Sequence, residues 1–144
     1  MDVVGNPSSV HAEGRAAKGL IERARAQVAR AFGADGADII FVSGATEAAA
    51  LACAGRGLQG ADVEHDAVRA WIDPVLRVTA QGAVAVQEPG QTALQLANSE
   101  TGVVQDLPDG VAVVDATQAF GKLPVAGDLS GLCSCASFSR RRAR

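Results

Sequence analysis

The stretch Ile39-Ile40-Phe41-Val42-Ser43-Gly44-Ala45-Thr46-Glu47 decides the fold class of this chain. The apolar run from Asp38 to Val42 predicts a short buried strand. Ser43 and Gly44 then form a turn, and the alanine-rich segment from about Thr46 to Ala54 predicts a helix. A strand that leads directly into a helix is the unit from which mainly parallel α/β sheets are built.

The same alternation continues on both sides of this stretch. Apolar residues three or four positions apart predict a helix from Ser8 to Phe32, which Gly33 ends. Further strands are predicted at residues 62–64, 76–79, 83–86, 93–97 and 111–114, with a short helix from His65 to Trp71. The connection from Asn98 to Val111 is so short that it predicts a crossover without a full helix. The chain is therefore predicted to be an α/β protein with a mainly parallel sheet.

Composition excludes several classes of protein. The 144 residues are 48% hydrophobic and 20% charged, which is typical of a single globular domain and not of a disordered chain. A net charge of −3 and only 3% aromatic residues argue against a nucleic-acid partner. The arginines at positions 140–142 and 144 are predicted to form a short solvated tail.

Membrane insertion and export are also not predicted. The sequence has no apolar run long enough to span a membrane and no signal peptide at its start. Cys53, Cys133 and Cys135 are an odd number of cysteines, which we interpret as reduced thiols. Their spacing does not predict a metal site. A cytoplasmic location is expected.

Polar residues follow several of the predicted strands. Because parallel strands end at the same edge of a sheet, Ser43–Thr46, His65, Asn98-Ser99 and Asp115–Gln118 are expected to converge there. The turn at Ser43–Thr46 either binds an anion or is an ordinary helix cap. Likewise, Asp115 either binds a cationic nitrogen or caps a turn, and His65 is either a ring partner or a structural residue.

Taken together, these groups suit pyridoxal 5′-phosphate. The ligand would use an anion cradle, a partner for a flat ring and a carboxylate for a protonated nitrogen. Residues 55–60 also match the GxGxxG spacing of dinucleotide sites. They follow a helix and precede a strand, which is the reverse of the required context, so we interpret them as a flexible connection.

Five segments, in the order of a known family, carry a strong resemblance. The chain resembles the cysteine desulfurases of the class V aminotransferase group, which are pyridoxal-phosphate enzymes of fold type I. The resemblance implies that residues 1–139 form part of the large cofactor-binding domain, a partial three-layer α/β/α structure, and that residues 140–144 are an unmatched arginine-rich tail. The segments are Gly5-Asn6-Pro7-Ser8-Ser9 with His11 and Gly14-Arg15, Ile40–Glu47, Glu64–Val68, Asn98–Val103 and Val114–Pro124.

The resemblance implies a role for each matching residue. Ala45, Thr46 and the Ser139 hydroxyl would bind the cofactor phosphate. His65 would lie over the pyridine ring, Asp115 would pair with the ring nitrogen, and Gln118 would reach the phenolic oxygen. In the family, L-cysteine gives its sulfur to a cysteine thiolate as a persulfide, and alanine is released. The resemblance also implies a homodimer and a sulfur-acceptor or iron–sulfur scaffold protein as partner.

The chain departs from the family pattern at positions that matter for catalysis. Ser99 stands where the family has an asparagine that helps to bind the substrate carboxylate. Neither Lys18 nor Lys122 matches the Schiff-base lysine, and no cysteine matches the sulfur acceptor. The resemblance therefore implies that no catalytic residue is retained and that the substrate-binding C-terminal domain is missing. We expect a truncated or frameshifted product that binds the cofactor at most non-covalently and has no desulfurase turnover alone.

Two other functions remain open at this point. The chain could be a non-catalytic partner of an intact subunit. It could also derive from a related class V enzyme, such as a selenocysteine lyase or an aminotransferase, since the whole group shares these motifs.

Overall fold

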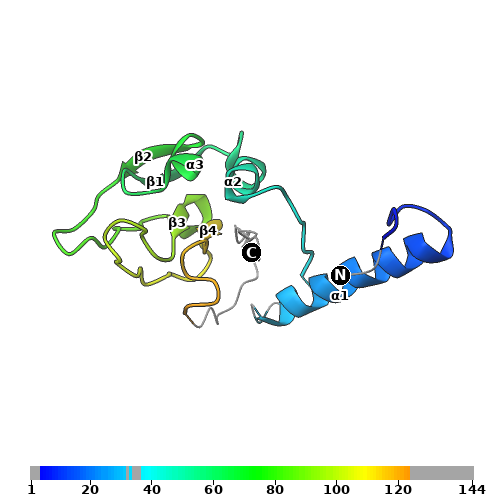
Figure 1. The fold of residues 1–144 in the computed structure, drawn as a ribbon. Coiled ribbons are helices and arrows are strands. Elements are labelled where there is room, and N and C mark those ends of the chain that lie inside the picture. Colours follow the sequence, from blue (N-terminus) through cyan, green and yellow to red (C-terminus); the bar gives the residue numbers. More distant parts are fainter. Residues whose placement is uncertain (1–3, 32, 34–36, 124–144) are drawn as a thin grey trace. The chain divides into compact units, whose positions relative to one another are not determined.

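The computed structural model describes residues 4–31, 33 and 37–123, and it divides into two compact units (Figure 1). The boundary between the units lies between Phe41 and Val42. The predicted site residue Ser139, the two cysteines Cys133 and Cys135, and the arginine-rich tail lie outside the described residues. Among the residues that are described, no helix combines the length and the apolar character that crossing a bilayer requires.

The first unit is built on α1 (Ala12–Ala31), which confirms most of the predicted helix. The prediction was wrong for residues 8–11, which form turns before the helix begins. Asn6 Oδ1 accepts a hydrogen bond from Ser8 N at 2.9 Å, and Ser9 Oγ accepts one from His11 N at 3.3 Å. These local bonds compete with helical ones, so the helix starts later. Gly33 has a φ of 65°, as expected for a residue that ends a helix.

Gly14 lets the turn at residues 6–9 lie directly on α1. A Cβ atom at Gly14 would lie 2.6 Å from the carbonyl oxygens of both Asn6 and Ser9. These oxygens belong to the backbone and cannot move aside as a flexible side chain can. A glycine is therefore required here by close packing of the backbone.

We expect Gly14→Ala to displace this turn, at a cost of roughly 1–3 kcal/mol. The control is Gly19→Ala in the same helix, where a Cβ atom would lie 3.6 Å from Arg23 Nη1, at ordinary van der Waals distance. That change should favour the helix. Hydrogen exchange at Ser9 N, which donates to Asn6 O at 2.9 Å, measures the effect. Unchanged protection of Ser9 in Gly14→Ala would contradict the packing argument.

Up to Leu123, where the described part of the chain ends, the second unit contains two pairs of parallel strands and two α-helices. Its elements are α2 (Ala45–Cys53), β1 (Leu58–Ala61), α3 (Asp66–Arg69), β2 (Ile72–Leu76), the 3-10 turn η1 (Pro89–Gln91), β3 (Ala93–Gln95) and β4 (Val113–Asp115). β1 pairs with β2 and β3 pairs with β4, both in parallel. A parallel bridge between Gln59 and Thr92 joins the two pairs. The predicted α/β class with a mainly parallel sheet is confirmed.

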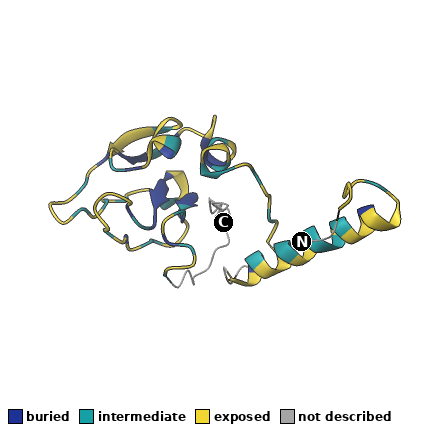
Figure 2. Cartoon of the chain, in the orientation of Figure 1, coloured by how far each residue is buried: buried dark blue, intermediate teal, exposed yellow. Residues whose placement is uncertain are grey.

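The core of this unit lies where α2 and α3 pack on the strands (Figure 2). Its residues are mostly small, which allows close packing in a chain with few aromatic side chains. Leu94 in β3 is the largest side chain among the most deeply buried residues of the described chain. The core cluster consists of Ala49, Ala52, Cys53, Leu58, Val68, Ala93, Ala112 and Val113.

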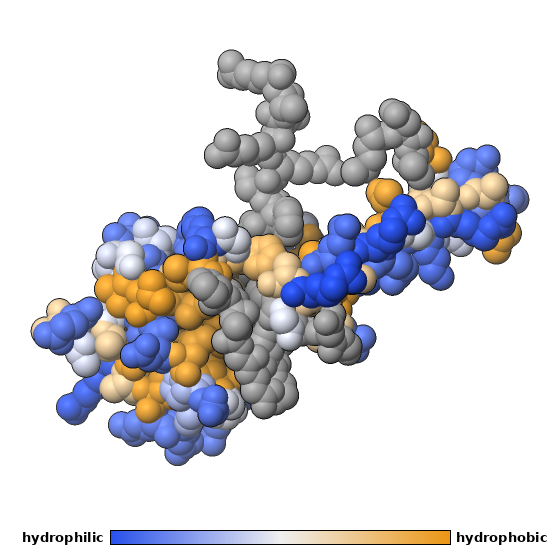
Figure 3. Space-filling view, turned by 90° about the horizontal axis from the view of Figure 1, so that it is seen from below, coloured by the Kyte–Doolittle hydropathy of each residue, from blue (hydrophilic) through white to orange (hydrophobic). Residues whose placement is uncertain are grey.

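Large apolar side chains also reach the surface, and Figure 3 shows apolar residues gathered on the lower face of the second unit. Leu51 on α2 is 66% exposed, and Val75 on β2 is 55% exposed. The same residue types therefore occur both in the core and on the surface of this unit.

The strand predicted at residues 38–42 is absent. Ile40 is 75% exposed, and Phe41 is partly covered by the Arg25 guanidinium, which lies 4.9 Å from its ring centroid. A strand requires ladder hydrogen bonds to a neighbour. Residues 38–42 have no such ladder within the described chain, so the apolar run does not form a strand.

The strand predicted at residues 62–64 was also misplaced, because β1 ends at Ala61. Its middle residues, Gln59 and Gly60, fall in the segment that was interpreted as a flexible connection, and that interpretation was wrong. A Cβ at Gly60 would run into Ile72 and would lie 3.2 Å from Ala93 O. Glycine thus permits the close approach of neighbouring strands.

The other strands lie close to their predicted positions but are shorter or shifted. β2 ends at Leu76, the residue at which the strand was predicted to begin. It contains Pro74, which is tolerated in an edge strand. Residues 83–86 contribute only an antiparallel bridge between Val78 and Val84. As predicted, residues 96–112 cross from β3 to β4 without a helix.

Candidate functional site

The segments that follow β1 and β3 are tied together by hydrogen bonds. Val63 O accepts from Gln95 Nε2 at 2.6 Å and from Asn98 Nδ2 at 2.9 Å. Gln95 is in register with Asp115 across the β3–β4 pair. The residues after β1 and β3 and the last residue of β4 therefore meet at one edge of the sheet.

Asn98 organises the turn after β3 from a position that is only 9% exposed. Its Oδ1 accepts hydrogen bonds from Glu100 N, Thr101 N and Thr101 Oγ1 at 2.8–3.0 Å. Ser99, the doubtful substrate residue, is exposed, and its Oγ lies 3.5 Å from Glu100 Oε1. The turn places the Ser99 side chain at the surface, and the buried Asn98 side chain stabilises the turn through these hydrogen bonds.

Asp115 is half-buried at the end of β4. Its Oδ1 accepts a hydrogen bond from Thr117 N at 2.9 Å, so it does cap the following turn. A carboxylate has two oxygens and about four lone-pair sites, and this bond uses one of them. Capping and binding of a cationic nitrogen are therefore compatible at Asp115.

His65 is exposed and caps α3, since its Nδ1 accepts from Ala67 N at 3.1 Å. In the neutral imidazole, this bond places the proton on Nε2. The cap fixes the ring at the start of the helix and leaves it accessible from solvent. The structural role of His65 is thus present, and it does not prevent contact with a flat ligand.

Gln118 lies one turn beyond Asp115 and is exposed. Its Oε1 accepts from Lys122 Nζ at 3.0 Å, and its amide nitrogen is a donor. Lys122 thus contacts a predicted cofactor residue, whereas Lys18 lies on α1 in the first unit.

The start of α2 has an unusual cap. The N-cap residue is Gly44, which has no side chain to accept a hydrogen bond, so the interpretation of Ser43 or Thr46 as the N-cap was wrong. Instead, Glu47 Oε2 accepts from Ser43 N at 2.7 Å and from Ser43 Oγ at 2.6 Å. Both bonds lower the pKa of the Glu47 carboxyl, and the bond from the Ser43 hydroxyl has the larger effect.

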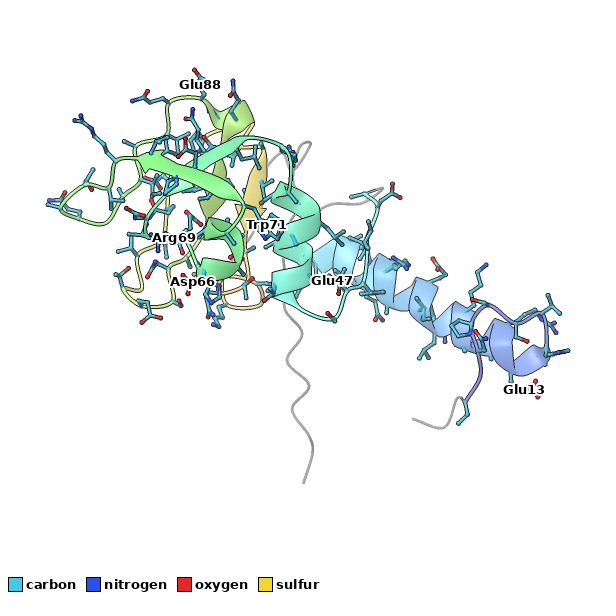
Figure 4. All side chains as sticks on the ribbon, turned by 90° about the horizontal axis from the view of Figure 1, so that it is seen from above. Glu13, Glu47, Asp66, Arg69, Trp71 and Glu88 are labelled. Carbon is cyan, nitrogen blue, oxygen red and sulfur yellow. The ribbon has the colours of Figure 1, made fainter. Side chains whose placement is uncertain are left out.

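The N–H groups of Ala45 and Thr46 belong to the first turn of α2, where backbone donors have no partner within the helix. Glu47 lies in the first turn of α2, and Asp66 lies in the first turn of α3. Figure 4 shows both residues on the same side of the second unit. The start of α2 therefore faces the same side of the unit as the segment that carries His65. First-turn donors and the helix dipole favour an anion at this position.

Glu64 was named in the sequence analysis only as part of a matching segment and was not identified there as a site residue. It is only 4% exposed, and its Oε2 has no hydrogen-bond partner among the described residues. Burial raises its pKa to about 8; the hydrogen bond from Gln95 N opposes this shift, and the charge of Asp115 adds to it. A carboxylate at the end of a predicted buried strand needs a hydrogen-bonded or charged partner, and this argument would have identified Glu64.

These groups fit pyridoxal 5′-phosphate in chemical type. Helix donors for a phosphate, an accessible imidazole and a half-buried carboxylate all belong to the second unit and lie at its strand ends and helix starts. Within the described residues, no group of three His, Cys, Asp or Glu side chains could hold a metal ion.

Comparison with known proteins places these features in a family. The model of the family Aminotransferase class-V matches residues 1–70. A cysteine desulfurase of Frankia sp. is 34% identical over 88% of this chain and 41% of its own length. The cysteine desulfurase IscS of Neisseria meningitidis is 35% identical over 86% of this chain and 40% of its own. The chain thus spans about two fifths of the length of these relatives.

Solved structures agree with this assignment. A NifS-like protein from Rickettsia africae has a TM-score of 0.76 at 27% identity, over 91% of this chain and 46% of its own. DndA from Streptomyces lividans has a TM-score of 0.66 at 29% identity, over 88% of this chain and 45% of its own. With the parallel α/β fold, these similarities show that the chain is related to the class V aminotransferases and, among them, to cysteine desulfurases.

Proposed function

We propose that this chain contributes the cofactor-binding part of a cysteine desulfurase, which transfers sulfur from L-cysteine and releases L-alanine. The observation that carries the proposal is the position of Asp115. It is a half-buried carboxylate at the end of a core strand, in register with Gln95, which is bonded to the segment before His65. The desulfurase relatives support the choice of substrate class.

When bound, pyridoxal 5′-phosphate supplies an electron sink for carbanion chemistry at the α-carbon of the substrate. In this proposal, Asp115 keeps a proton on the ring nitrogen, because an adjacent negative charge favours the cationic form. The N–H groups of Ala45 and Thr46 bind the phosphate, with the Ser139 hydroxyl as a further donor. His65 lies against the face of the ring, and the amide of Gln118 donates to the phenolic oxygen.

We further propose that the polypeptide of residues 1–144 binds the cofactor without a covalent bond and has no desulfurase turnover alone. Its lysines are Lys18 and Lys122, and neither occupies the family position of the Schiff-base lysine. In the whole protein, the same resemblance suggests a cytoplasmic homodimer that passes sulfur to an acceptor or iron–sulfur scaffold protein.

Binding of pyridoxamine 5′-phosphate tests the role of Asp115, because this ligand has no aldehyde and cannot react with lysines. We expect Asp115→Asn to weaken its binding by roughly tenfold or more, since a hydrogen-bonded charge pair is lost. Asp109→Asn changes an exposed aspartate and is the matched control. Fluorescence titration measures both dissociation constants.

Equal binding by wild-type and Asp115→Asn protein would contradict the assignment of Asp115. For the covalent question, borohydride treatment of the pyridoxal 5′-phosphate complex should leave no pyridoxyl group on a single specific lysine. Stoichiometric labelling of Lys122 would overturn the non-covalent proposal, and so would sulfide release from L-cysteine above the rate of free cofactor.

A further inference from the structure

Glu64 is a buried polar group for which the proposed function has no role. It is 4% exposed, and its Oε2 is buried without a hydrogen-bond partner among the described residues. It immediately precedes His65, and the charge of Asp115 acts on it. It is therefore close to two residues that are assigned to the cofactor.

Three hydrogen bonds connect the segment that contains Glu64 to β3 and to the turn after it. Glu64 Oε1 accepts from Gln95 N at 3.2 Å. The preceding carbonyl, Val63 O, accepts from the side chains of Gln95 and Asn98. Gln95 is in register with Asp115, and Leu96 N donates to Asp115 O at 2.9 Å. The backbone that leads into His65 is thus fixed to the strand pair that ends at Asp115.

We propose that Glu64 is a positioning residue of the cofactor site, which fixes the place of His65 relative to Asp115 through its bond to Gln95 N. The proposal rests on the proposed function for its ligand, but the positioning itself exists without ligand. Val63 and Glu64 both accept hydrogen bonds from β3 or from the turn after it. Loss of the Glu64 bond alone therefore leaves the fold in place, but the segment before His65 is held less firmly.

The charges around Glu64 are consistent with an uncharged acid. Burial favours the protonated form, and so does Asp115 on β4. Two residues earlier, Asp62 is paired with Arg69 at 3.0 Å, so this arginine already has an acidic partner. A neutral Glu64 can still accept from Gln95 N, and it leaves the negative charge on Asp115. Glutamine has the same shape and no charge, so it should replace Glu64 in this role.

The experiment compares Glu64→Gln and Glu64→Ala with Glu88→Ala, a change at an exposed glutamate. Pyridoxamine 5′-phosphate is the probe. We expect Glu64→Gln and Glu88→Ala to bind within about twofold of wild type and Glu64→Ala to bind about tenfold more weakly, because one positioning bond is lost. In ligand-free protein, the NMR signals of the Gln95 amide and the His65 ring should move in Glu64→Ala and stay in place in Glu64→Gln.

Wild-type affinity in Glu64→Ala, together with unmoved His65 signals, would overturn the proposal. If wild-type protein does not bind the probe, the proposed function fails, and the NMR signals of His65 and Gln95 decide the positioning role separately. If Glu64→Ala does not fold, Glu64→Asp decides, because its side chain is one methylene shorter and its carboxyl lies further from Gln95 N. The NMR signals of the Gln95 amide and the His65 ring should then move, and unmoved signals would overturn the proposal.

Discussion

Replacing Leu94 by alanine is expected to lower the free energy of unfolding of the second unit by about 3 kcal/mol, within the 2–5 kcal/mol range for buried leucines. Leu94 lies in β3 and is only 1% exposed. Truncating its side chain leaves a cavity in the core next to β3. The other core residues are mostly small, so they cannot fill this cavity. Because domains are stable by only about 5–15 kcal/mol, this is a large fraction of the total.

Leu51→Ala is the matched control, since it makes the same chemical change at a residue that is 66% exposed on α2. Its effect should stay within about 0.5 kcal/mol. Urea denaturation followed by circular dichroism gives both values, provided that both proteins unfold in one transition. Equal losses for the two variants would show that the core does not lie around β3.

The second large effect is a fall in stability as pH rises from about 4.5 to about 8. The pKa of Glu64 is about 8 in the folded protein, against 4.5 for an exposed glutamate. The folded state therefore keeps a proton that the unfolded state releases in this interval. The contribution of Glu64 is complete below about pH 4.5 and is lost by about pH 8, on the order of 5 kcal/mol in total.

Glu64→Gln cannot ionise, so this part of the pH dependence should disappear in the variant. Glu88→Gln changes an exposed glutamate and should keep the wild-type slope. Denaturant unfolding at several pH values between 4.5 and 8.5 measures the three profiles. If the profiles of wild type and Glu64→Gln are parallel over this interval, Glu64 is ionised in the folded protein and the pKa argument is wrong.

Sequence patterns predicted the α/β class, α1, α2 and the helix-free crossover, because these depend on local spacing and on chain length. Exact strand positions depend on pairing partners, which local patterns do not contain. The run at residues 38–42 is apolar enough for a strand but has no ladder in the described chain. In contrast, Gln59 and Gly60 look like a loop and become strand residues because β2 and β3 lie beside them.

The candidate site, like the fold, could be predicted only in part from the sequence. Asp115 could be identified from its position after an apolar run and His65 from its position after a predicted strand, and the motifs strengthened both assignments. The bond from Gln95 N to Glu64 spans 31 residues, so no local pattern indicates it. The N-cap position of Gly44 could not be predicted either, because Ser43 and Thr46 are both better cap residues by type than glycine.

The helix-free crossover between β3 and β4 has a consequence for how the length of this chain can vary. The position of Asp115 depends on the register of three residue pairs, from Ala93–Val113 to Gln95–Asp115. Insertions between Asp106 and Gly110 would lengthen a turn at the surface and leave that register intact. A single inserted residue within β4 would turn Asp115 to the opposite face of the sheet. Length variation among homologues should therefore concentrate in the crossover and stop at Val113.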